Sequence, residues 1–127
     1  MFQLDQNSTI SIPKLQDCQK LAIEIAKQTQ HKDLFIIYLS GDLGTGKTTF
    51  SQYFIRALTK IESPIKSPTY TIIESYAFQK HKIYHLDLYR IHTPSEIEQL
   101  GLKDLLADNA HWLIEWPEKG CNFLPKP

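Results

Sequence analysis

Arginine is scarce in this sequence, which has two, Arg56 and Arg90, among 14 basic residues. Small phosphotransferases that move a γ-phosphate onto a metabolite usually bring several arginines to hold the phosphate charge. The scarcity of arginine therefore disfavours a small-molecule kinase.

The formal net charge is +0, because 14 acidic residues balance the 14 basic ones. A direct nucleic-acid binder more often carries an excess of positive charge, so we expect any role with RNA to pass through protein partners.

Cysteine and long apolar runs are sparse as well. The two cysteines, Cys18 and Cys121, lie far apart and outside any CxxC spacing, which favours reduced thiols over a disulfide. The longest apolar stretch, Leu34–Leu39, is far shorter than the ~20 residues that span a bilayer. The first residues show no basic segment followed by an apolar run, as a secretion signal would. We therefore expect a cytoplasmic protein with no membrane partner.

The spacing of apolar residues predicts three helical segments. They run over 15–27, 48–59 and 95–107, and the last has the pattern of two short helices separated by a glycine. Thr93 or Ser95 would form its N-cap. Cys18 falls on the apolar face of the first segment, where core packing is its expected role.

Four segments have strand patterns. The continuous apolar run Leu34–Leu39 is typical of a central strand buried on both faces. The alternating segments 69–76 and 82–88, with AFQKH between them, predict an antiparallel pair. Residues 111–116 (HWLIEW) form a last strand, and the proline-rich tail 117–127 shows no periodicity.

Residues 41–48 read GDLGTGKT and satisfy the phosphate-loop pattern G-x-x-x-x-G-K-[ST]. The glycines let backbone N–H groups turn inward onto phosphate oxygens, and the following helix adds the positive end of its dipole. Lys47, at a solvent-facing loop, would counter the charge of the β- and γ-phosphates, and the Thr48 hydroxyl would bind Mg²⁺. A chance match arises in about one chain in a few hundred of this length. Here a buried strand precedes the motif and a helix follows it, as a P-loop requires.

These patterns together predict an α/β fold, a P-loop NTPase three-layer domain with a mixed, mostly parallel sheet. The length and the ordinary composition, 42% hydrophobic and 22% charged, indicate one domain over residues 1–127. ATP is preferred over GTP, because the one near match to a guanine-reading element, residues 59–62, ends in Glu and follows the P-loop helix directly.

Two acidic residues stand at the ends of predicted strands. Asp87 ends the segment HLD in an alternating strand, the usual setting of a Walker B aspartate, and Glu115 closes the run LIE. Ligands of open α/β sheets collect beyond the carboxyl ends of parallel strands, so both carboxylates could serve a metal. The alternative for each is a solvated carboxylate at a strand end, and for Trp116 it is a packing aromatic.

Five segments, taken in order, resemble the TsaE family, also called YjeE. They are GDLGTGKTTF (41–50), KSPTYTIIESY (66–76), IYHLDLYR (83–90), EIEQLGLKDLL (96–106) and LIEWPEKG (113–120). The resemblance covers nearly all of residues 34–120. It implies a weak ATPase that binds ATP with Mg²⁺ and works with the TsaD and TsaB proteins. That assembly transfers a threonylcarbamoyl group to an adenosine next to the anticodon of tRNA, which this chain would reach only through its partners.

The resemblance also implies residue roles. The expected nucleotide-binding residues are Gly41, Leu43, Gly44, Thr45, Gly46, Lys47, Thr48, Thr49 and Trp116. The expected catalytic residues are Thr69, a switch-like threonine, Asp87, the Walker B acid, and Glu115. Mg²⁺ would be held by Thr48, Asp87 and Glu115, whereas Tyr70 and His85 could equally be scaffold.

Two other functions stay open. A small-molecule kinase should show a metabolite pocket and further arginines. A nucleotide-gated binding module would hydrolyse nothing at a useful rate alone, and it differs from the partner-dependent ATPase only in whether partners raise turnover.

Overall fold

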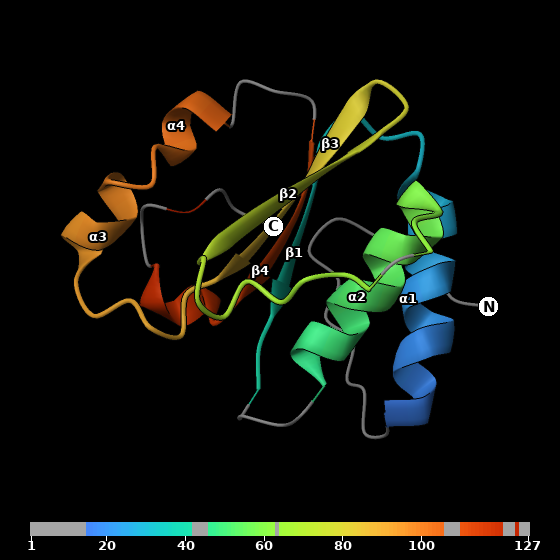
Figure 1. The fold of residues 1–127 in the computed structure, drawn as a ribbon, viewed down its shortest axis with the longest axis horizontal. Coiled ribbons are helices and arrows are strands. Elements are labelled where there is room, and N and C mark those ends of the chain that lie inside the picture. The colour runs from blue at the N-terminus through green and yellow to red at the C-terminus, as the bar shows by residue number, and fades with distance from the viewer. Residues whose placement is uncertain (1–14, 42–45, 63, 106–109, 121–123, 125–127) are drawn as a thin grey trace.

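The computed structural model describes residues 15–41, 46–62, 64–105, 110–120 and 124. These residues form a sheet between two helical layers (Figure 1). Helices α1 (Leu15–Thr29) and α2 (Lys47–Thr59) cover one face, and the short helices α3 (Pro94–Glu98) and α4 (Leu102–Leu105) lie on the other side. The predicted three-layer α/β architecture is confirmed. No helix in the described part of the chain is long and apolar enough to cross a membrane.

The sheet has four strands in the order β1-β4-β3-β2. Their bounds are β1 Phe35–Leu39, β2 Ile73–Phe78, β3 His81–Asp87 and β4 Ala110–Glu115. β4 runs parallel to both β1 and β3, whereas β2 pairs antiparallel with β3. The sheet is therefore mixed and mostly parallel, and the predicted antiparallel pair is confirmed.

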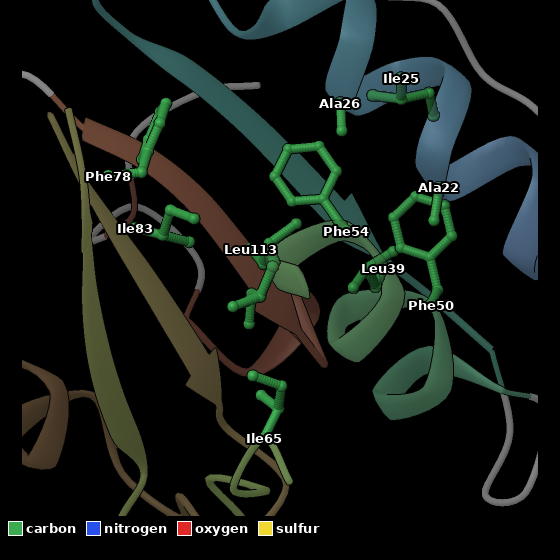
Figure 2. Close-up of a cluster of buried hydrophobic side chains, with 11 residues drawn as sticks. Ala22, Ile25, Ala26, Leu39, Phe50, Phe54, Ile65, Phe78, Ile83 and Leu113 are labelled. Atoms are coloured by element: carbon green, nitrogen blue, oxygen red, sulfur yellow. The ribbon is translucent and has the colours of Figure 1, made fainter. Parts of the chain in front are cut away.

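Side chains of the three parallel strands alternate between two cores, as the two-residue period of a strand requires. Odd-numbered residues, among them Leu39, Ile83 and Leu113, pack with Phe50 and Phe54 of α2 (Figure 2). Even-numbered residues face α3 and α4, and the apolar members of this second cluster on the parallel strands are Ile36, Tyr38, Tyr84, Leu86, Ala110, Trp112 and Ile114. The odd-numbered positions therefore face the helix that follows the phosphate loop.

Three sequence signals for the helices have the places in the structure that we expected. Cys18 of α1 is 2% exposed, which confirms its expected core position. Thr93 is the N-cap of α3 and forms a capping box with Glu96, each side chain bonding the other residue's backbone N–H. Gly101, at φ +69, lies between α3 and α4 in the left-handed region that glycine adopts without cost.

The segment Leu34–Leu39 was predicted to be a central strand buried on both faces, and among the described strands this holds only in part. Within the described residues β1 lies at an edge of the sheet, and its residues 35–38 are only half-buried. β4 is the strand with parallel neighbours on both sides, and all of its residues are buried. An apolar run indicates that both faces of a strand are covered, which is true of β1, but it does not reveal whether both edges are paired.

The strand predicted over 69–76 begins later than expected. Residues 68–71 form a turn in which the Ile72 N–H donates to the Pro68 carbonyl at 2.8 Å, and β2 starts at Ile73. Ile72 has φ 69, a left-handed conformation that is unusual for a β-branched residue and ends the extended chain on that side.

The hairpin between β2 and β3 is tighter than predicted. Phe78 pairs with His81, so only Gln79 and Lys80 connect the strands, and Gln79 at φ 51 reverses the chain. The last strand ends at Glu115 instead of Trp116. Part of the tail forms a short 3₁₀ helix, Pro117–Lys119, where no regular structure was predicted.

Candidate functional site

The carboxyl ends of the three parallel strands meet at one edge of the sheet. Leu39 of β1 is in register with Glu115 of β4, and Glu115 is in register with Asp87 of β3. Both carboxylates occupy odd-numbered positions and so lie on the sheet face that α2 covers. The parallel strands bring the two acids together beside the P-loop helix, as the sequence predicted.

The described ends of the phosphate loop have glycine-dependent backbones. Gly41 has φ 146, and Gly46, the N-cap of α2, has φ 98, values that L side chains rarely adopt. Helix α2 then begins at Lys47, with Thr48 and Thr49 in its first turn. Three of the expected phosphate ligands, Leu43, Gly44 and Thr45, lie outside the described residues.

Lys47 is buried, although its loop was expected to face solvent. The residue is 9% exposed. The ammonium donates a hydrogen bond to the carbonyl of Gly41 and lies over the ring of Trp116, with Nζ 4.1 Å from the ring centre. The lysine is thus held at the phosphate loop by a backbone carbonyl and an aromatic face.

Glu115 connects the P-loop helix to the sheet. The Thr48 hydroxyl donates to Glu115 Oε1 at 2.9 Å. The second carboxylate oxygen, Oε2, lies 2.5 Å from Nε2 of His85 on the neighbouring strand. Glu115 is 2% exposed and His85 is fully buried, so their contact is shielded from solvent, whereas the contact with Thr48 is partly buried. The contact from Thr48 therefore goes to Glu115, whereas the sequence had assigned the Walker B position to Asp87.

Asp87 is the second buried carboxyl at this edge, at 6% exposure, and its Oδ1 accepts the N–H of Tyr89 at 3.0 Å. Burial is the main influence on the pKa of Asp87 and raises it above its usual value. The Tyr89 hydrogen bond lowers this pKa, the negative charge of Glu115 raises it, and His85 and Lys47 lower it. The net result is a raised pKa, so the charged form of Asp87 is disfavoured until a cation compensates it.

Thr69 is only partly brought to the site. Its hydroxyl hydrogen-bonds to the Ser67 hydroxyl at 2.7 Å, and not to Thr48 or either carboxylate. The turn that carries Thr69 is nevertheless attached to β3, because the Asp87 N–H donates to the Ile72 carbonyl at 2.9 Å. The structure therefore joins the Thr69 segment to Asp87 through the backbone.

Trp116 follows Glu115 in a left-handed conformation, φ 58, that a tryptophan rarely adopts. The backbone N–H of Trp116 donates to the Leu39 carbonyl at 3.3 Å, and the centre of its ring is 5.0 Å from the centre of the Tyr89 ring. Lys119 in turn lies over Tyr89, with Nζ 4.8 Å from the ring centre. Strained backbone at a site edge often accompanies function. Trp116 therefore lies at the phosphate loop and also packs against an aromatic neighbour.

The sequence interpretation missed three residues of this site, Tyr89, Lys119 and the role of His85. His85 precedes Asp87 by two residues, and that spacing predicts a shared strand face. Tyr89 and Lys119 gave no such signal, because their contacts join segments 30 residues apart.

The side chains here have the chemistry that Mg²⁺ prefers. A threonine hydroxyl and two carboxylates offer hard oxygen ligands, and Mg²⁺ is usually held by one or two carboxylates together with phosphates of the substrate. Within the described ranges, no group of three or more His, Cys, Asp or Glu residues could hold a metal unaided. The oxygen chemistry of Thr48, Asp87 and Glu115 fits a magnesium ion.

A model of a protein family described as "Threonylcarbamoyl adenosine biosynthesis protein TsaE" matches residues 12–127. The chain belongs to the TsaE family. Among relatives named tRNA threonylcarbamoyladenosine biosynthesis protein TsaE, that of Haemophilus influenzae is 40% identical over 103 residues, which are 81% of this chain and 65% of the relative. That of Aquifex aeolicus is 38% identical over 113 residues, 86% of this chain and 77% of the relative.

The likeness to TsaE proteins extends to solved structures. The crystal structure of Bacillus subtilis YdiB has a TM-score of 0.65 and 28% identity, over 91% of this chain and 67% of that one. This supports the α/β P-loop NTPase fold. The chain spans 65% of the Haemophilus influenzae TsaE and 62% of the Rickettsia conorii TsaE, which is 39% identical.

Proposed function

We propose that this TsaE chain binds ATP with Mg²⁺ at the carboxyl edge of its sheet. The observation that carries the proposal is the 2.9 Å hydrogen bond between the Thr48 hydroxyl and Glu115. It joins the residue that follows the P-loop lysine to a buried acid at a strand end, and Asp87 lies beside that acid in register. Such a combination of loop, hydroxyl and acid is the magnesium-binding arrangement of P-loop NTPases.

Each residue then has a defined role. Lys47 exchanges the Gly41 carbonyl and the Trp116 ring for phosphate oxygens. Thr48, Glu115 and Asp87 would hold Mg²⁺, which when bound neutralises charge on the β- and γ-phosphates. Asp87, whose pKa burial raises, would gain a compensating charge from the bound cation. Backbone N–H groups of the loop and the N-terminus of α2 complete the phosphate site.

We further propose that the protein is a weak ATPase that supports threonylcarbamoyl modification of adenosine in tRNA, together with TsaD and TsaB. The family description and the printed names of the relatives support the pathway. The positions of the two arginines support a low rate of ATP hydrolysis by the isolated chain. Arg90 lies with its guanidinium carbon 5.2 Å from the centre of the Tyr70 ring, and Arg56 is in the last turn of α2, opposite the end that holds Lys47. Arg56 is therefore not placed to stabilise transition-state charge, and Arg90 is the one other arginine of the sequence, so a partner would complete the site.

Calorimetry of nucleotide binding tests the proposal. Wild-type protein should bind ATP in Mg²⁺ buffer, and Lys47→Ala should bind at least ~10-fold more weakly, because one charge-assisted contact to phosphate is worth about 1.5–3 kcal/mol. Lys103→Ala is the matched control, since Lys103 is exposed on α4 at the opposite face. Tight binding of Mg-ATP by a folded Lys47→Ala protein would contradict the phosphate-loop assignment.

A further inference from the structure

His85 is the buried polar side chain of this site to which the proposed function gives no role. We infer that His85 is a positioning residue: it fixes the Glu115 carboxylate in the orientation in which Oε1 meets Thr48 and in which the carboxylate would hold a magnesium ion. The inference rests on the proposed function, because it assumes that Glu115 serves Mg²⁺.

The sheet register explains why His85 reaches Glu115. His85 of β3 pairs with Leu113 of β4, so Glu115 is its diagonal neighbour two residues further along. Diagonal side chains on one face of a sheet are close enough for long side chains to touch. Both residues occupy odd-numbered positions on the face that α2 covers, and the contact is Nε2 to Oε2 at 2.5 Å.

The hydrogen-bonding inventory fixes the direction of this contact. A carboxylate accepts and does not donate, so Nε2 of His85 carries the proton and donates to Oε2. Nδ1 of His85 is buried and has no hydrogen-bond partner within the described part of the chain. Among the described residues, the His85 ring therefore makes one hydrogen bond, and its acceptor is Glu115.

The consequence is that the two oxygens of Glu115 have different tasks. Oε2 is bound by His85 inside the sheet, and Oε1 is left toward Thr48 at the start of α2. Without the histidine, a carboxylate at 2% exposure would lose one of its two donors and would be free to rotate about its terminal torsion. Partners of this kind orient metal ligands, and their removal typically costs about 10–100-fold in metal affinity.

The competing explanation is that His85 only packs in the core, and His111 is an example of such a histidine. His111 is also fully buried on the same sheet face, and its Nε2 lies 3.0 Å from the Lys32 carbonyl, near the opposite end of β4 from Glu115. Its Nδ1 is likewise without a partner among the described residues. His111 is therefore a matched control, a buried histidine with one hydrogen bond and no contact with the acids.

The experiment measures the affinity for a non-hydrolysable ATP analogue by calorimetry, once with Mg²⁺ and once with EDTA. The ratio of the two dissociation constants is the magnesium dependence. We expect His85→Leu to reduce this ratio by about 10-fold or more, while the affinity in EDTA stays within about 2-fold of wild type because no phosphate contact is lost. His85→Gln keeps an N–H donor and should recover most of the ratio. His111→Leu should lower the melting temperature and leave the ratio unchanged.

The outcomes separate this inference from the proposed function. If wild-type protein binds the analogue with no magnesium dependence, both are overturned. If wild-type protein shows the dependence and a folded His85→Leu keeps it, only the role of His85 is overturned. Nitrogen-15 NMR of the wild-type histidines covers the case in which His85→Leu does not fold. His85 should show the tautomer with the proton on Nε2, and a proton on Nδ1 would overturn the inference.

Discussion

The ammonium of Lys47 lies 4.1 Å from the centre of the Trp116 ring, on the aromatic face. The same ammonium donates to the Gly41 carbonyl. A cation over an aromatic ring is held by about 0.5–2 kcal/mol, which phosphate oxygens can exceed. Nucleotide binding should therefore separate Lys47 from Trp116, and the indole is placed to report it.

Trp116 should change its fluorescence when ADP or ATP binds, because its cationic neighbour moves to the phosphates. Trp112 is the internal control: it is fully buried in the sheet and should be silent. The measurement is a fluorescence titration of wild type against Trp116→Phe. If Trp116→Phe retains the nucleotide-induced signal, Trp116 is not the reporter and its expected place near the nucleotide is wrong.

Asp87→Asn should raise the melting temperature of the ligand-free protein at about pH 7. The pKa of Asp87 is raised in the folded protein above its value of 3.8 in the unfolded chain. The folded state therefore binds more protons in this range, and its stability falls as pH rises from the unfolded pKa through the folded one. The asparagine stays neutral and its side-chain oxygen can still accept the Tyr89 N–H.

Thermal unfolding of both proteins as a function of pH checks this. The difference in melting temperature should be small at acid pH, where Asp87 is protonated, and should grow toward neutral pH. A variant that is less stable than wild type at neutral pH would show that Asp87 stabilises the ligand-free fold in its charged form.

Glu115→Gln and Asp87→Asn should each retain nucleotide binding and reduce ATP hydrolysis by at least about 10-fold, because ordering Mg²⁺ and water lowers the barrier more than it strengthens ground-state binding. Glu98→Gln is the control, because Glu98 is exposed on α3 across the sheet from α2. Full hydrolysis in either site variant would reduce that residue to a structural carboxylate.

Isolated protein should hydrolyse ATP slowly, and TsaD with TsaB and tRNA should accelerate it. A partner-supplied arginine can be worth roughly 10³- to 10⁵-fold in related phosphoryl transfer. With a net charge of +0, the chain alone should bind tRNA weakly. Turnover with and without partners at fixed salt, together with a tRNA titration, measures both. Fast unassisted hydrolysis or tight binding of tRNA would favour an autonomous enzyme, and no stimulation would favour a nucleotide-gated binding module.

Local patterns predicted most of the fold. The helical spacing of 48–59 and the capping signal at Thr93 depend on neighbours within one turn, and both are confirmed. The place of β1 among the described strands was not predictable, because strand order depends on pairing with β4, about 75 residues away in the chain. The turn before Ile73 was missed because alternating residues after a proline resemble a strand until the chain is seen to reverse.

The candidate site was predictable where a motif names its residues. The phosphate-loop pattern identified Lys47 and Thr48, and the strand ends identified Asp87 and Glu115. Which acid meets Thr48 depends on the side-chain geometry at the register of β3 and β4, which no local pattern contains. The contact of His85 with Glu115 depends on that register too, and so the sequence left open whether His85 belongs to the site or to the scaffold.

Successive side chains of β3 point to opposite faces of the sheet, so the number of residues between Ile83 and Asp87 is fixed. A single inserted or deleted residue between Ile83 and Asp87 would turn every later side chain to the opposite face. Asp87 would then point toward α3 and α4 among the residues that surround Leu86, and Leu88 would be carried toward the start of α2. In this chain, β3 should therefore tolerate substitutions far better than an insertion or a deletion, which would move Asp87 away from Glu115 and the start of α2.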